Sequence, residues 1–390
     1  MSVYKKILKK IAHFQTHHPY FTILVLVALT ILISTGMPNV KTVASLEKMM
    51  PEDMEEIKYF NILRDNFLGK DMIGIVIDVD MESQNEKGVF SVKDKRVLEY
   101  IENLKEQIGQ EDDVIETFAV TDALRKINGN QLPDEQAFDS LLKNKETAAL
   151  ISNYINDDFS TTYIIANTDV GTDDLRLNNL AEAIYDDIND AGRPAGIKVR
   201  VTGIPIIQQE LSRMIKHDRT STMWISALLV FIIILLLYRN FFSSLLPVIV
   251  VVTSVTWLYG TMGYFNLGIS TLAGGVAAIV IGIGIDYAIH LMNRYKYERK
   301  HGKKIIEATE EAVVSTGAAL IATALTTLAA FFAFLFGKMP EMGRFGTLMI
   351  IGIAYALFFT IIGLPALLVI EEKLVVFYRK KIKKFWIENA

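Results

Sequence analysis

Residues 271–299 read TLAGGVAAIVIGIGIDYAIHLMNRYKYER, in which one carboxylic acid, Asp286, interrupts an apolar run that ends at a charged segment after Asn293. A helix needs roughly 20 apolar residues to cross a hydrocarbon core about 30 Å thick. Leu267–Asn293 meets this requirement, and Asp286 is its only acidic or basic residue apart from His290. A carboxylate at the centre of a spanning helix costs about 2.5–3.5 kcal/mol. The sequence therefore predicts a spanning helix whose acid pairs, faces water or is protonated part of the time.

Small residues lead to this acid along one helical face. Gly275, Ala278, Gly282 and Asp286 are spaced three, four and four residues apart. Residues at this spacing lie on the same side of a helix. Small side chains let another helix approach closely. We therefore predict a helix-packing face at Gly275, Ala278 and Gly282.

Five further apolar runs are long enough to span a membrane, and none of them contains an acidic or basic residue. They are Tyr20–Gly36, Met223–Tyr238, Leu245–Phe265, Val313–Phe336 and Phe345–Ile370. The first run follows a basic segment and could instead be a cleaved signal peptide. Its length and the lack of an A-x-A site favour a retained anchor. The sequence thus predicts an α-helical membrane protein with six transmembrane helices.

Lysine and arginine collect on one side of these helices, which predicts the orientation. Basic clusters precede the first run and follow the fourth and sixth runs. We therefore expect a protein of the plasma membrane. Both of its termini are expected in the cytoplasm. The expected parts are a basic N-terminal segment (1–19), transmembrane helix 1 (20–37), an extracytoplasmic domain (38–218), transmembrane helices 2–6 (219–372) and a basic C-terminal tail (373–390).

The charge distribution and composition exclude several classes of protein. Residues 37–219 hold 35 acidic and 21 basic residues, and the other parts of the 390-residue chain hold 9 and 19. This segregation does not give the continuous basic surface of a nucleic-acid binder. With no cysteine, the chain has no disulfides and no cysteine nucleophile. The sequence contains no catalytic, dinucleotide-binding or metal-binding motif. We therefore predict that the protein is not an enzyme and that it binds no cofactor and no metal ion.

The polar segment between the first two predicted helices alternates strand-like and helix-like patterns. The order is βαββαβ with a helical insertion, which predicts an α+β domain of the ferredoxin-like kind. The strands are expected at 72–79, 114–120, 161–166 and 197–202. The helices are expected at 92–108 and 175–188, and the insertion at 133–154.

Polar side chains near Asp286 suggest a route for protons. Protonating this acid on one side of the membrane and releasing the proton on the other would couple a gradient to motion. Candidate partners are Tyr287, His290, Thr323 and Thr327. Each has a second interpretation: Tyr287 as a packing residue, His290 as a hydrated histidine, and the threonines as back-bonded to helix carbonyls.

The run GIGIDYAIHLMNRYKYER (Gly282–Arg299) resembles the fourth span of the resistance–nodulation–division (RND) superfamily. It is most similar to the branch of the mycobacterial-membrane-protein-large (MmpL) proteins and hopanoid exporters. VTGIP (201–205), GLPA (363–366) and PEMGRFG (340–346) also fit. The resemblance implies a porter-type external domain and proton-driven export of hydrophobic or amphiphilic molecules, often lipids. It places the proton relay on Asp286 and Tyr287.

The chain departs from that family's pattern in size, since typical members carry two such halves in one polypeptide. The resemblance therefore implies a homodimer whose Asp286 and Tyr287 face the same pair in the other copy. The expected partners are a second copy, a lipid-like molecule and the proton, with sodium as an open alternative. Two other functions stay open: a SecD/SecF-like protein-export accessory and a lipid or sterol sensor that does not transport.

Overall fold

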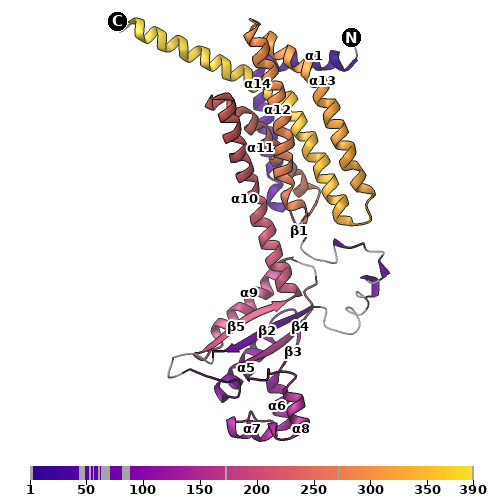
Figure 1. The fold of residues 1–390 in the computed structure, drawn as a ribbon, viewed down its shortest axis with the longest axis vertical. Helices are drawn as coiled ribbons and strands as arrows, with labels where there is room; N and C mark the ends of the chain where they lie inside the picture. Colours follow the sequence, from indigo (N-terminus) through magenta and orange to yellow (C-terminus); the bar gives the residue numbers. More distant parts are fainter. Residues whose placement is uncertain are drawn as a thin grey trace. The chain divides into compact units, whose positions relative to one another are not determined.

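The computed structural model describes residues 3–43, 49–51, 54–55, 57–59, 62, 71–80, 88–171, 174–270 and 272–388. The chain divides into two compact units (Figure 1). The first combines Met1–Pro51 with Met214–Ala390 and is helical. The second is Glu52–Arg213 and contains a four-stranded sheet.

Six helices among the described residues are long and apolar enough to cross a membrane, as the sequence predicts. Their length follows from uninterrupted apolar runs, because each residue adds about 1.5 Å to a helix. They are α2 (Pro19–Ser34), α10 (Ile204–Tyr238), α11 (Phe241–Tyr264), α12 (Val276–Lys300), α13 (Ile305–Phe332) and α14 (Pro340–Glu388).

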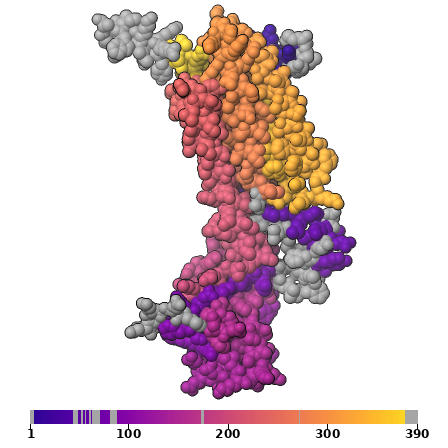
Figure 2. Space-filling view, in the orientation of Figure 1, coloured from indigo at the N-terminus to yellow at the C-terminus, as the bar shows by residue number. Residues whose placement is uncertain are grey.

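Three of these helices form the centre of the helical unit. The most apolar windows of α11, α12 and α14 are 61%, 50% and 61% buried, whereas those of α10 and α13 are each 11% buried. Figure 2 shows α12, α13 and α14 packed side by side. Glycine permits a close approach between these helices: a Cβ added at Gly284 of α12 would lie 2.9 Å from the Ala356 Cβ and 3.0 Å from a Val251 methyl. The exposed apolar faces of α10 and α13 are suited to lipid or to a partner helix.

Several helix boundaries differ from the predicted ones, and the differences at the start of α12 and at the end of α14 change the description most. The fourth span was expected from Leu267, but α12 begins at Val276. Before it, β6 (Ile269–Ser270) pairs in parallel with β1 (Thr42–Val43), and a short 3-10 helix, η2, covers Leu272–Gly275. Two consecutive glycines favour this irregular start because glycine is a poor helix former. At the other end of the chain, α14 continues past the predicted span to Glu388 without a break.

The basic N-terminal segment forms a helix, α1 (Val3–His17), that packs on α13 and α14. Its Leu8 and Ala12 are buried, while Lys5, Lys6, Lys9 and Lys10 are exposed. Leu8 lies against Gly317 of α13, where an added Cβ would be 3.3 Å from the leucine methyl. The segment is therefore an amphipathic helix bound to the helical unit.

The second unit has the predicted order of strands and helices. β2 (Asp71–Val79) and β4 (Thr161–Thr168) are central, and the antiparallel sheet has the order β3-β4-β2-β5. Alternate residues of β2, from Ile73 to Val79, are buried in one core with α5 and α9 residues. The other elements are β3 (Val114–Ala119), β5 (Ile197–Gly203), α5 (Lys95–Ile108), α6 (Val120–Ile127), α7 (Glu135–Leu142), α8 (Lys145–Ile151) and α9 (Asp174–Asp190). Helices α7 and α8 form the predicted insertion.

Asp187 on α9 is expected to limit the stability of this second unit. Burial raises its pKa to about 6, and the charges of Glu111, Asp186 and Asp190 add to this effect. Because the folded pKa lies above the unfolded value of about 3.9, the penalty is full above pH 6 and disappears below about pH 4. Asp187→Asn should therefore stabilise the unit by about 1 kcal/mol near pH 7, a value discounted for partial exposure.

Hydrogen exchange of the α9 amides in the full chain can measure this gain. These amides should exchange more slowly in Asp187→Asn than in the wild type, and this difference should become smaller as the pH falls toward about 4. Glu182→Gln, an exposed change on the same helix, is the control. A gain that is as large near pH 4 as near pH 7 would contradict the explanation.

Candidate functional site

Asp286 lies on an exposed face of α12. Gly275, Gly282 and His290 are exposed on the same side, and Ala278 is half-buried. A Cβ added at Gly275 or Gly282 would meet no atom of the described residues within 4 Å. The small-residue face predicted from the sequence is therefore open at the surface of the helical unit, with the carboxylate at one end.

Tyr287 points away from this face and into the helical unit, as the turn of about 100° per residue requires. Its side chain is 3% exposed. Its hydroxyl is buried and has no hydrogen-bond partner among the described residues. The neighbouring polar groups that act on it are Thr327 of α13 and Asp286. Tyr287 thus connects the exposed acid to the interior contact between α12 and α13.

The two predicted threonines lie one helical turn apart on α13. The Thr327 hydroxyl donates a hydrogen bond to the Thr323 carbonyl at 3.0 Å, and the Thr326 hydroxyl donates to the same carbonyl at 2.8 Å. This is the back-bonding expected of threonine in a spanning helix. The lone pairs of Thr327 remain able to accept a hydrogen bond from the Tyr287 hydroxyl. The Thr323 side chain is exposed.

The structure therefore brings three of the five predicted relay residues together: Asp286, Tyr287 and Thr327. His290 lies one turn beyond Asp286 on the exposed face, and Thr323 lies one turn before Thr327. A carboxylate, a phenol and an alcohol are groups that can take part in a proton relay when hydrogen bonds join them. Their role in proton movement stays a prediction.

Ion pairs at the far end of α12 were not predicted. Glu298 is 4% exposed and lies 2.6 Å from Arg294 and 2.9 Å from Lys303. Glu372 of α14 pairs with Arg299 and accepts a hydrogen bond from Tyr295. In the sequence these basic residues predict only which side of the membrane is cytoplasmic. The four-residue spacing of Arg294 and Glu298 is the one local sign of an ion pair. The pairs join α12 to α14 and to the loop before α13.

An apolar cavity of about 440 Å³ lies between α1, α2 and α14. Ile11, Leu26 and Phe358 are among its lining residues, and Lys10 and Phe14 line both it and a neighbouring basic cavity. The lining suits an alkyl chain. Two histidines of the basic cavity, His13 and His17, lie beside Glu310 of α13 and form a second polar cluster with it.

Comparison with known proteins gives the family context of this arrangement. A sequence profile of the MMPL family matches residues 23–389. A protein of Methanocaldococcus jannaschii that is named only as a membrane protein is 31% identical over 379 residues, which are 97% of each chain. The hopanoid transporter HpnN of Rhodopseudomonas palustris is 28% identical over 44% of this chain and 20% of its own length. The sulfolipid-1 exporter MmpL8 of Mycobacterium tuberculosis is 28% identical over 29% of this chain and 10% of its own length. The chain thus matches short parts of long transporters and nearly the whole of one short protein.

Proposed function

The chain belongs to the MMPL family, and we propose that it is a proton-driven transporter of hydrophobic or amphiphilic, lipid-like molecules that works as a homodimer. The relatives that have named substrates are a hopanoid transporter and a sulfolipid-1 exporter. Both substrates are lipids, which supports a lipid-like cargo here. An apolar cavity beside α1, α2 and α14 that suits an alkyl chain is consistent with such a cargo.

The observation that carries the proposal is the position of Asp286. It is exposed on the open small-residue face of a helix long enough to cross a membrane. A carboxylate that faces hydrocarbon costs several kcal/mol, so such residues face a bundle interior or a water-filled space. A second copy packed on the face of Gly275, Ala278 and Gly282 would provide that interior and bring two acids near each other.

The proposed coupling uses the titration of Asp286. When the acid is neutral, it tolerates a closed apolar surrounding; when it is charged, it favours water or a partner. Alternating between these states changes which dimer arrangement is favoured. Tyr287 and Thr327 would exchange protons with it from the interior side. Each proton that returns across 100 mV supplies about 2.3 kcal/mol for this change.

We further propose that residues 38–218 form an extracytoplasmic, ferredoxin-like porter-type domain and that both termini are cytoplasmic. The strand order β3-β4-β2-β5, with α5 and α9 as crossovers, agrees with that fold type. The lysines of α1 and the cations that follow α12 support the orientation, because basic residues accumulate on the cytoplasmic side. The membrane concerned is the plasma membrane.

Lipid transfer in proteoliposomes tests the function. With an imposed pH gradient, the purified protein should move a labelled lipid severalfold faster than with no gradient, and a protonophore should remove the difference. A sodium gradient at equal pH on both sides is expected to have no effect. Transfer that is equal with and without the pH gradient would instead indicate a lipid-binding protein that is not driven by protons.

A further inference from the structure

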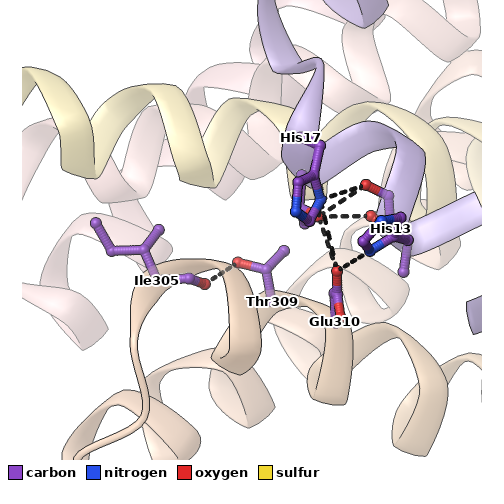
Figure 3. Close-up of polar contacts among 7 residues, drawn as sticks. His13, His17, Ile305, Thr309 and Glu310 are labelled. Carbon is purple, nitrogen blue, oxygen red and sulfur yellow. Dashed lines mark hydrogen bonds and ion pairs between the residues drawn. The ribbon is translucent and has the colours of Figure 1, made fainter.

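Two histidines of α1 and one glutamate of α13 point toward one another (Figure 3). His13 and His17 are one helical turn apart, and their Nδ1 atoms lie 3.0 Å and 3.8 Å from the Glu310 Oε1. One ligand atom from each residue can be chosen so that all three lie within 4.8 Å of one another. The proposed transport mechanism makes no use of these three residues.

We propose that His13, His17 and Glu310 form a binding site for a divalent transition-metal ion, above all Zn²⁺. Zinc binds histidine nitrogen at about 2.0–2.1 Å and carboxylate oxygen at about 2.0–2.2 Å, so two ligands of a tetrahedral ion lie about 3.4 Å apart. The observed separations of 3.0 Å and 3.8 Å fall on either side of this value. Shifts of a few tenths of an ångström would place all three ligands around one ion.

The surroundings of the cluster support metal binding. Two histidines and one carboxylate are a common zinc ligand set, and it leaves a fourth position for water. The Thr16 hydroxyl lies 3.2 Å from the Glu310 Oε1 and can donate to it, which helps to hold the carboxylate in place. The His13 and His17 side chains are 64% and 42% exposed, so an ion can enter from solvent.

Two features of the site weaken the binding of a metal ion. His17 Nδ1 also lies 2.9 Å from the His13 carbonyl, a contact that metal binding would replace. Lys6, Lys9 and Lys10 line the same basic cavity as the histidines. Their positive charge weakens cation binding. We therefore expect weaker binding than at a closed four-ligand zinc site.

Metal binding would have a mechanical consequence for the helical unit. α1 and α13 meet through Leu8 and Gly317 as well as through this cluster. An ion held by both helices would fix the end of α13 to α1. Because α13 also carries Thr323 and Thr327, the site is placed to restrict the movement of a helix that contacts Tyr287.

Zinc titration of the full chain without a polyhistidine tag tests the proposal. Competition with a chromophoric chelator should show one Zn²⁺ per chain, and thermal unfolding should shift upward when Zn²⁺ is present. His13→Ala, His17→Ala and Glu310→Gln should each weaken binding at least tenfold. The matched control is His18→Ala, an exposed histidine that lines the same basic cavity but lies outside the cluster.

Each outcome decides for or against the site. Glu310→Gln keeps the size of the side chain, so unfolding measured in the absence of metal will show that the variant still folds. Tetrahedral cobalt absorption bands in the wild type, lost in Glu310→Gln, would support a site with this carboxylate as ligand. Equal Zn²⁺ affinity in the wild type and Glu310→Gln, or an equal loss in His18→Ala, would overturn it.

Discussion

Asp286→Asn is expected to abolish gradient-driven lipid transfer while leaving membrane insertion and assembly intact. Asparagine has nearly the same shape as aspartate and hydrogen-bonds in its place, but it cannot take up and release a proton. One proton returning across 100 mV supplies about 2.3 kcal/mol, which corresponds to a factor of about 50 in a concentration ratio. Loss of that coupling should therefore slow lipid transfer in proteoliposomes severalfold, to the rate measured without a gradient, and should remove an accumulation of lipid of up to about 50-fold.

Two further variants separate titration from structure. Asp286→Glu keeps an acid at this position and should retain part of the activity, with a changed pH dependence. Asp186→Asn removes a carboxylate from the exposed side of α9 and should leave transfer unchanged. Wild-type gradient dependence in Asp286→Asn would remove this acid from the mechanism.

Run length and periodicity in the sequence were enough to predict most of the fold. The six apolar helices and the buried alternation of Ile73, Ile75 and Ile77 both follow from one-dimensional patterns. The resemblance carried by Gly282–Arg299 is likewise confirmed by the match to the MMPL family. The late start of α12 was not predicted, because the pairing of Ile269 with Thr42 joins residues far apart in the chain.

For the polar sites, too, contacts within one helix could be predicted from the sequence, whereas contacts between distant residues could not. Asp286 and Gly282 share a face because they are four residues apart, which follows from helix geometry. Tyr287, which the resemblance had implied to face a second copy, lies instead inside the helical unit because it is about 100° further around the helix. Glu310 lies 297 residues from His13 in the sequence, so no local spacing predicts that the two side chains are in contact. The H-x-x-x-H spacing of His13 and His17 was a local signal, but on a short basic segment it indicates a metal site only when a third ligand is known.

Gly282→Leu is expected to disrupt the homodimer without unfolding the chain. A Cβ added at Gly282 meets nothing within 4 Å among the described residues, so a larger side chain fits the single copy. In the proposed dimer, the same side chain would separate two helices that need small residues at their contact. We expect the dimer to weaken at least tenfold, or about 1.4 kcal/mol.

Gly284→Leu, two residues further along α12, should instead destabilise the single copy. There an added Cβ would lie 2.9 Å from Ala356 and 3.0 Å from Val251, inside the single copy. Overpacking of this kind costs about 1–3 kcal/mol, so this variant should unfold at a lower temperature whether or not it dimerises.

Cross-linking in the membrane can compare the two variants, because the chain has no native cysteine. A cysteine at Ala278 should trap dimers in the wild-type background and few or none in Gly282→Leu. Helix content should stay unchanged in Gly282→Leu, and the unfolding temperature of the single, dissociated chain should fall only in Gly284→Leu. If Gly282→Leu cross-links as well as the wild type, the face of Gly275, Ala278 and Gly282 is not the dimer contact. Asp286 would then lack the partner that makes its exposed position in a membrane tolerable.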